Sequence, residues 1–433
     1  MRRSCVWAWG LILLVCGWCA ASATALDAPH TLHHSKSAPQ HLSVHARAHH
    51  RAPVHRSTAK RASSARTTSQ GTASRHVVQG SKAGTASLRR ASLRTHHHRY
   101  YERFTASSFV NGPIGEGDVT SGEDPVVRQA AIDALGDMNG TAVVINPANG
   151  RILAMVNQKL ALSPGAEPCS TIKLSVALAA LSEGLVTRDT MVQLQGFRMN
   201  MTQAIAHSNN LYFEELGREL GFDRVRHYAN QFGLGELAGY NIPGEQLGVY
   251  PDEPIPASQG GVGRMCSFGQ GVSMTALQLG ALVAAIANGG TLYYLQHPAT
   301  PEEVTNFQPR VKRTLDIAKF VPDLQDGMAG AVRYGTARRL RINFQELPVF
   351  GKTGTCSDNG TRFGWFASYS QTPQGNLVTV FFLEGGRPTF GPRAAELTGE
   401  FYKNLWDRNY FSSKEQQTAQ ASDPSSVAAG ASQ

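Results

Sequence analysis

The 433-residue chain is predicted to contain an α+β domain at residues 105–410, with an antiparallel β-sheet flanked by helices. Two β-rich segments around a Pro-Ala-Asn-Gly turn, residues 141–146 and 152–156, indicate a hairpin. Further β-rich segments separated by short turns lie near the C-terminus and precede a helical segment. A hairpin, several helices, a strand meander and a closing helix together favour a sheet packed between helices.

Most helices of this domain are predicted between the hairpin and the strand meander. One helix is expected earlier, within residues 119–138. The next is expected to begin near Ser170 and to end at Gly184, because the residues between them lack Gly and Pro and are rich in Ala and Leu. Residues 185–235 are also predicted to be helical, whereas residues 233–263, rich in Gly and Pro, are predicted to be loop.

The second half of the domain has clearer boundaries. Thr275 and Gln278 have the spacing of a capping box, which predicts a helix that runs to Ala287. Another helix is expected over residues 316–334. The remaining elements are strands near residues 349–355, 363–369 and 377–383 and a terminal helix at residues 394–406.

The N-terminal residues have the composition of a secretory signal peptide. Residues 1–25 begin with Arg2 and Arg3, continue with an apolar core and end in an Ala-Thr-Ala sequence. The alternative is an uncleaved membrane anchor, although the apolar core is short for a membrane span. Both interpretations place the rest of the chain beyond the inner membrane, in the periplasm or the cell envelope.

Residues 26–104 are strongly basic. They hold 14 Lys or Arg against two acidic residues, and 12 of the 15 histidines of the chain. This composition predicts disorder, because too little apolar surface can be buried to offset chain entropy. Two interpretations stay open, a solvated linker or adhesion to anionic envelope polymers. The rest of the chain is mildly acidic, which does not support nucleic-acid binding, and residues 411–433 are expected to form a polar, disordered tail.

Ser170 and Lys173 are one turn apart in the predicted helix and therefore share a face. A serine hydroxyl is a weak nucleophile at neutral pH, but a desolvated lysine can lose its proton and act as the base. Backbone N–H groups at a helix N-terminus can also stabilise an oxyanion. The Ser-x-x-Lys pattern alone also fits an ordinary helix, so other motifs must decide between the two interpretations.

Two further motifs favour catalysis. Residues 208–210 are Ser-Asn-Asn and residues 352–355 are Lys-Thr-Gly-Thr. The order Ser-x-x-Lys, Ser-x-Asn, Lys-Thr-Gly resembles that of the penicillin-recognising serine acyltransferases, in particular the transpeptidase domain of penicillin-binding proteins. Other family landmarks follow in the expected order: the hairpin at 142–156, Gly-Gln-Gly at 269–271, Gly-Thr-Ala at 335–337 and Gly-Trp-Phe at 364–366. The similarity covers residues 125–408.

The resemblance implies acyl transfer on the D-Ala-D-Ala stem peptides of peptidoglycan, without a cofactor or metal. Ser170 would attack the carbonyl of the penultimate D-alanine while Lys173 accepts the hydroxyl proton. Ser208 would relay a proton to the leaving amine, and Asn210 would bind a backbone amide of the substrate. Each residue also has a structural alternative, such as a helix cap for Ser208 or a turn residue for Asn210.

The Lys-Thr-Gly motif is expected on the edge strand of the sheet. The resemblance implies that Lys352 adds positive potential near the terminal carboxylate of the substrate, which Thr353 and Thr355 would bind beside Gly354. The backbone N–H groups of Ser170 and Thr355 would form the oxyanion hole. The structural alternative for Lys352 is protection of the sheet edge.

Three cysteines fall within the predicted domain: Cys169, Cys266 and Cys356. The secreted location permits disulfides, and all three pairings are open. Cys169 also departs from the family pattern, since Gly or another small residue usually precedes the nucleophile. A disulfide could hold the two sides of the active-site cleft together. Alternatively, Cys169 could be a reactive thiol at a helix N-terminus, or all three cysteines could be small buried residues.

Two other functions fit parts of the sequence. A class D β-lactamase shares the fold and the motif order, but Asn210 stands where that class usually has an apolar residue. A wall-binding or sensor module of the same fold would keep the fold without turnover. The function predicted is a penicillin-binding D,D-transpeptidase or D,D-carboxypeptidase, with β-lactams as inhibitors.

Overall fold

The computed structural model describes residues 105–412. The predicted signal peptide, the basic tract at 26–104 and all but the first two residues of the predicted C-terminal tail lie outside this range. Among the helices of residues 105–412, none has both the length and the apolar character needed to cross a membrane.

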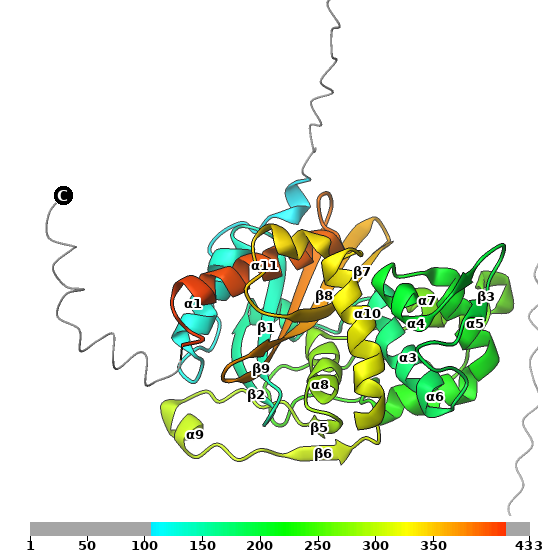
Figure 1. The fold of residues 1–433 in the computed structure, drawn as a ribbon. Coiled ribbons are helices and arrows are strands. Elements are labelled where there is room, and N and C mark those ends of the chain that lie inside the picture. Colours follow the sequence, from blue (N-terminus) through cyan, green and yellow to red (C-terminus); the bar gives the residue numbers. More distant parts are fainter. Residues whose placement is uncertain (1–104, 413–433) are drawn as a thin grey trace, which may run out of the picture. The chain divides into compact units, whose positions relative to one another are not determined.

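A five-stranded antiparallel sheet forms the centre of the domain, with the strand order β2-β1-β9-β8-β7 (Figure 1). The predicted hairpin is β1 (Gly140–Asn146) and β2 (Arg151–Val156), and the predicted meander is β7 (Val349–Asp358), β8 (Thr361–Thr372) and β9 (Gly375–Gly385). The α+β fold class is therefore confirmed. β7 is an edge strand, so one side of its backbone is not paired within the sheet.

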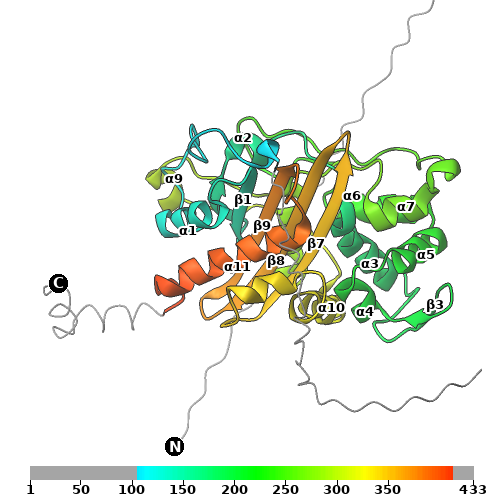
Figure 2. The same cartoon turned by 90° about the horizontal axis from the view of Figure 1, so that it is seen from above.

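Different helices cover the two faces of the sheet (Figure 2). α1 (Pro125–Leu135) and α11 (Gly391–Asp407) pack on one face, and α8 (Ala276–Ala287) packs on the other. α8 begins at the predicted capping box, in which Thr275 and Gln278 each bind the other's backbone N–H.

Alternate residues of β1 join two separate apolar cores. Ala142 and Val144 pack beneath α1 and α11, whereas Val143 and Ile145 pack with α8 and the helices beyond it. Gly280 lets α8 lie close to the sheet, because an added Cβ would be 2.6 Å from the Ile145 side chain. The sheet is thus buried on both faces, and β7 is placed at its border.

A group of helices lies beside this border (Figures 1 and 2). α10 (Val321–Arg333) packs against both β7 and α4, and so connects the sheet to the group. The other members are α3 (Lys173–Ser182), α4 (Met201–Ala206), α5 (Asn210–Leu220), α6 (Phe222–Gln231) and α7 (Gly261–Phe268).

The helix predicted to begin near Ser170 is confirmed, because the 3-10 turn η2 (Cys169–Ile172) leads directly into α3, which starts at Lys173. Two other predictions about local structure are wrong. Residues 185–200 are not helical, since β3 (Val192–Gln193) and β4 (Arg198–Met199) form a small hairpin there. The predicted loop at 233–263 ends earlier, with the turn η3 and the start of α7.

The remaining elements are short and were not predicted individually. They are η1 (Ala106–Ser108), α2 (Gln158–Ala161), η3 (Ala257–Gln259), β5 (Thr291–Tyr293), α9 (Pro301–Thr305), β6 (Val311–Thr314), η4 (Ala318–Phe320) and η5 (Arg338–Ile342). β5 and β6 pair with each other as a separate two-stranded sheet.

Candidate active site

Ser170 lies in the turn η2, which packs against the edge strand β7. Thr171 closes the turn, because its N–H and hydroxyl groups donate to the Pro168 carbonyl oxygen at 3.1 and 2.6 Å. Gly354 of β7 faces the same carbonyl. A Cβ atom on Gly354 would lie 2.9 Å from that oxygen, so glycine allows the strand to approach the turn this closely.

Lys173 is fully buried, and its Nζ atom lies 2.9 Å from Ser170 Oγ. The same nitrogen donates to the Ser208 carbonyl oxygen at 2.9 Å and to Asn210 Oδ1 at 2.6 Å. Burial, reinforced by the positive charge of Lys352, lowers the pKa of Lys173 well below its ordinary value. Lys173 therefore has the position and the lowered proton affinity that a base for Ser170 requires.

The Ser208 hydroxyl connects two lysines. Its Oγ atom lies 3.1 Å from Lys173 Nζ and 2.8 Å from Lys352 Nζ. Ser208 stands between α4 and α5 with a φ of 54°, and the cap of α5 is Asn209, whose Oδ1 accepts the Tyr212 N–H at 2.9 Å. The alternative that Ser208 merely caps this helix is therefore wrong.

Lys352 is also fully buried, within β7. Its Nζ atom donates to the carbonyl oxygen of the next residue, Thr353, at 2.9 Å, and burial lowers the pKa of Lys352 to about 7. Among residues 105–412, no carboxylate forms an ion pair with Lys173 or Lys352. Two charged lysines that share one hydroxyl repel each other, and this repulsion adds to burial in lowering the pKa of Lys173, while the negative charge of Glu214 acts in the opposite direction.

The two threonines of the Lys-Thr-Gly-Thr motif have different partners. Thr353 Oγ1 donates to Thr336 Oγ1 at 2.7 Å, whereas the exposed Thr355 accepts the Gly391 N–H of α11 at 2.8 Å. In the sequence, Thr336 is recognisable only as part of the Gly-Thr-Ala landmark. Its contact with the motif depends on α10 ending beside β7, and no local pattern predicts that.

Other residues outside the motifs also shape the site. His207 directly precedes Ser208, and Tyr334 directly precedes the Gly-Thr-Ala landmark. Both side chains are exposed, and their ring centroids are 5.6 Å apart. Trp365 of β8 is buried, and its Nε1–H donates to the Glu167 carbonyl oxygen at 3.0 Å. The indole thus holds the chain that leads into η2 against the sheet.

A disulfide joins Cys169 of η2 to Cys356 of β7, with the two Cα atoms 5.6 Å apart. Of the three pairings that the sequence leaves open, this is the one present, and Cys266 is a buried free thiol. Burial raises the pKa of Cys266 to about 12, so this thiol is unreactive as well as inaccessible. The bridge connects the residue before Ser170 to the residue after Thr355.

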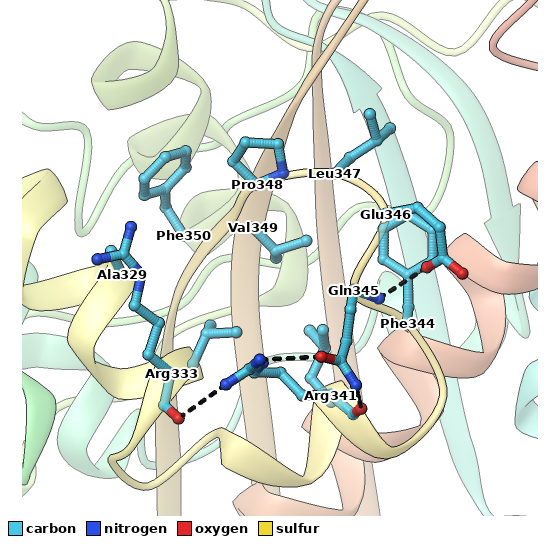
Figure 3. Close-up of a pocket in the computed structure, with 12 residues that line it drawn as sticks. Ala329, Arg333, Arg341, Phe344, Gln345, Glu346, Leu347, Pro348, Val349 and Phe350 are labelled. Carbon is cyan, nitrogen blue, oxygen red and sulfur yellow. Dashed lines mark hydrogen bonds between the residues drawn. The ribbon is translucent and has the colours of Figure 1, made fainter.

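A cavity of about 430 Å³ lies beside the start of β7 (Figure 3). Its walls include Phe344, Val349 and Phe350, and Arg333 and Arg341 lie at its edge. None of the three motifs lines this cavity. It is therefore separate from the place where Ser170 and the two lysines meet.

All three motifs meet at one junction: the first at the start of α3, the second between α4 and α5, and the third on β7. Residues 140–404 match the family model for the penicillin-binding protein transpeptidase domain. The chain belongs to this family. The match covers more than half of the chain and includes every motif residue predicted for the site.

Two curated relatives illustrate the family's range. Stage V sporulation protein D of Bacillus subtilis is 30% identical over 258 residues, which are 49% of this chain and 39% of that protein. Penicillin-binding protein PbpB of Mycolicibacterium smegmatis is 27% identical over 275 residues, 52% of this chain and 42% of that protein. The chain thus spans about two fifths of the length of each of these relatives.

Solved structures share the fold of this transpeptidase domain. Penicillin-binding protein 3 of Mycobacterium tuberculosis, in complex with aztreonam, has a TM-score of 0.54 and 23% identity over 66% of this chain and 77% of that one. The D,D-transpeptidase domain of a peptidoglycan glycosyltransferase from Eggerthella lenta has a TM-score of 0.51 and 20% identity over 66% and 81%. At these identities, the similarity establishes the fold.

Peptide mapping without reduction should recover residues 169 and 356 in one cross-linked pair, because their sulfurs are bonded. Cys266 should react with an alkylating reagent only after unfolding, because its side chain is fully buried. Mass spectrometry of the alkylated digest measures both. Alkylation of all three cysteines in unreduced, unfolded protein would contradict the bridge.

Proposed function

We propose that this chain is a penicillin-binding serine acyltransferase that acts on D-Ala-D-Ala stem peptides of peptidoglycan through an acyl-enzyme at Ser170. The observation that carries the proposal is the 2.9 Å separation between Ser170 Oγ and the buried Nζ of Lys173. Several relatives are named peptidoglycan D,D-transpeptidases, which supports this substrate class.

Acylation begins when Lys173 accepts the Ser170 proton as Oγ attacks the carbonyl carbon of the penultimate D-alanine. The C–N bond to the terminal D-alanine then breaks, and the departing nitrogen needs a proton. Ser208 Oγ lies within hydrogen-bond distance of Lys173 Nζ, so it can pass the proton from Lys173 to this nitrogen. Asn210 orients the lysine through Oδ1 and presents its amide group to the substrate backbone.

The tetrahedral intermediate carries a negative oxygen that needs hydrogen-bond donors. The backbone N–H groups of Ser170 and Thr355 are the proposed donors, and each such donor contributes about 3 kcal/mol in comparable enzymes. Gly354 permits a close approach of η2 to β7, which supports the proposal that both groups serve one oxygen. The unpaired side of β7 gives the stem peptide an edge on which to bind.

The terminal carboxylate of the substrate would bind next to Lys352. Thr353 and Thr355 supply the hydroxyl groups. Thr355 Oγ1 accepts the Gly391 N–H and keeps its own hydrogen to donate, whereas Thr353 would turn its hydrogen from Thr336 Oγ1 to the carboxylate. The contact with Thr336 holds the Thr353 side chain in the free site, which makes Thr336 a positioning residue. A β-lactam carries a carboxylate in a similar place, so it would acylate Ser170 in the same way and remain bound.

The acyl-enzyme can pass to an amine, which gives a cross-link, or to water, which gives a trimmed stem peptide. Both reactions use peptidoglycan, so the site of action proposed is the periplasm or the cell envelope. The basic tract at 26–104 would then lie beside anionic envelope polymers and could bind them.

A pulse of benzylpenicillin should add the mass of one intact drug molecule to the full chain, because ring opening releases no leaving group. Intact-mass spectrometry over hours measures the adduct. Ser170→Ala should abolish it, whereas Ser175→Ala should keep it, since the Ser175 hydroxyl only binds a carbonyl within the same helix region.

The time course distinguishes the alternatives. A long-lived adduct supports a penicillin-binding protein, and rapid loss of adduct with drug consumption would show a β-lactamase. No adduct on correctly folded protein would contradict the proposal and favour a module without catalysis. Release of D-alanine from a diacyl-D-Ala-D-Ala peptide, with and without an acceptor amine, then separates trimming from cross-linking.

The two lysines should affect different parts of the pH dependence of acylation: Lys173 the rate constant and Lys352 the affinity for the drug. The acylation rate constant should rise with pH through the lowered pKa of Lys173 and then level off, because only neutral Lys173 can accept the proton. The affinity for the drug should weaken as pH rises through about 7, because Lys352 loses its charge.

Stopped-flow acylation with a fluorescent penicillin separates the rate constant from the affinity. The methyl ester of the same drug lacks the carboxylate, so its affinity should not fall across this range. A rate constant that keeps rising towards the ordinary pKa of lysine would contradict a neutral Lys173.

A further inference from the structure

Cys169 has a backbone conformation that usually requires glycine. Its φ is 51°, in the left-handed region that residues with a Cβ atom rarely adopt. Its side chain is fully buried and its sulfur is bonded to Cys356. A cysteine in this conformation needs an external restraint, and the bridge to β7 is such a restraint.

The bridge lies next to both donors of the proposed oxyanion hole. Cys169 directly precedes Ser170, and Cys356 directly follows Thr355. The 5.6 Å separation of the bridged Cα atoms therefore limits how far the two flanking N–H groups can move apart. No other covalent link among residues 105–412 joins η2 to β7 beyond the chain itself.

We propose that the Cys169–Cys356 bridge positions the oxyanion hole by holding residue 169 in the left-handed conformation, and that its reduction slows acylation of Ser170. This inference rests on the proposed acyltransferase function. The Ser170–Lys173 pair is assembled in the bridged protein, with Lys173 Nζ at 2.9 Å from Ser170 Oγ, so the bridged form has the geometry that acylation requires.

Two carboxylates near the bridge, Glu167 and Asp358, oppose the contact between η2 and β7. Burial and the negative charge of Asp358 raise the pKa of Glu167, while Arg264 acts in the opposite direction. Asp358 ends β7 and Glu167 lies just before η2, so two carboxylates repel each other across the segments that the bridge connects. Without the bridge, this repulsion favours separation of the turn from the strand.

Noncovalent contacts that do not include the bridge limit this separation. Trp365 donates to the Glu167 carbonyl oxygen, and Gly354 packs against Pro168 and Thr171. Reduction should therefore shift the two N–H groups without unfolding the domain. The expected consequence is a slower chemical step with little change in drug binding.

The redox step is a thiol–disulfide exchange with a dithiol. The dithiol supplies two electrons and two protons, the bond between the two sulfur atoms breaks, and two thiols form while the dithiol becomes a disulfide. Oxidation by a disulfide compound reverses the step. The activity of the site would thereby depend on the thiol balance of its compartment.

The test compares acylation by a fluorescent penicillin in the full chain, bridged or reduced. A resin-bound dithiol is used and removed before the drug is added, because free thiols attack β-lactams. Reduction should lower the acylation rate constant about tenfold, less than the loss of a whole donor, and should change the drug affinity less than twofold. Reoxidation should restore the rate, and the Cys266→Ala variant should respond in the same way as the natural chain.

Two variants address the backbone of residue 169. Cys356→Ser should be about tenfold slower even in the oxidised state. Adding Cys169→Gly should restore the rate to within about threefold of the bridged protein, because glycine adopts a positive φ without a restraint. A melting curve for each variant shows whether it is folded at the assay temperature, and rescue by glycine distinguishes positioning from a general loss of stability.

Equal or faster acylation by the reduced protein would overturn the proposal, and so would failure of glycine to rescue a folded Cys356→Ser variant. An oxidised chain that penicillin does not acylate in any state would instead overturn the proposed function itself. The failures of the two proposals are therefore distinguishable.

Discussion

The interaction on which the site depends is the burial of two lysines around one serine hydroxyl. Lys173 and Lys352 both contact Ser208 Oγ, and neither has a carboxylate partner among residues 105–412. Burying two ammonium groups without an ion-pair partner is unfavourable even when they are hydrogen-bonded, and loss of a proton relieves this cost. The fold thereby lowers the pKa of the amine beside Ser170 Oγ, which favours the neutral form that activation of a serine hydroxyl requires.

The arrangement of the domain explains how this burial is achieved. The sheet is covered on both faces, and its edge strand β7, which has one row of backbone groups unpaired within the sheet, contacts η2 and α10 at the border with the group of helices. The first two motifs lie where helices begin or end, and the third lies within β7 at this border. Side chains at such positions can converge, while the elements that carry them remain rigid.

The sequence predicts this site better than it predicts the local structure around it. Ser170, Lys173, Ser208 and Lys352 are recognisable because their order along the chain resembles a known family, and the fold brings them together. The 3-10 turn at Ser170 and the small hairpin at 192–199 are set by packing against other elements, which overrides the helical composition of those segments. The pairing of Cys169 with Cys356 depends on the distance between η2 and β7, and cysteine spacing does not encode that distance.

The ionisation state of Lys173 tests the account most directly. The ¹³Cε chemical shift of Lys173 reports its charge in full chain labelled at lysine, with assignment by difference from Lys173→Met. Lys173 is expected to titrate well below the ordinary pKa of a lysine and to be neutral where acylation is fast. A Lys173 that stays protonated up to the pH range of an ordinary lysine would contradict the account, because the ammonium form cannot accept the proton of Ser170.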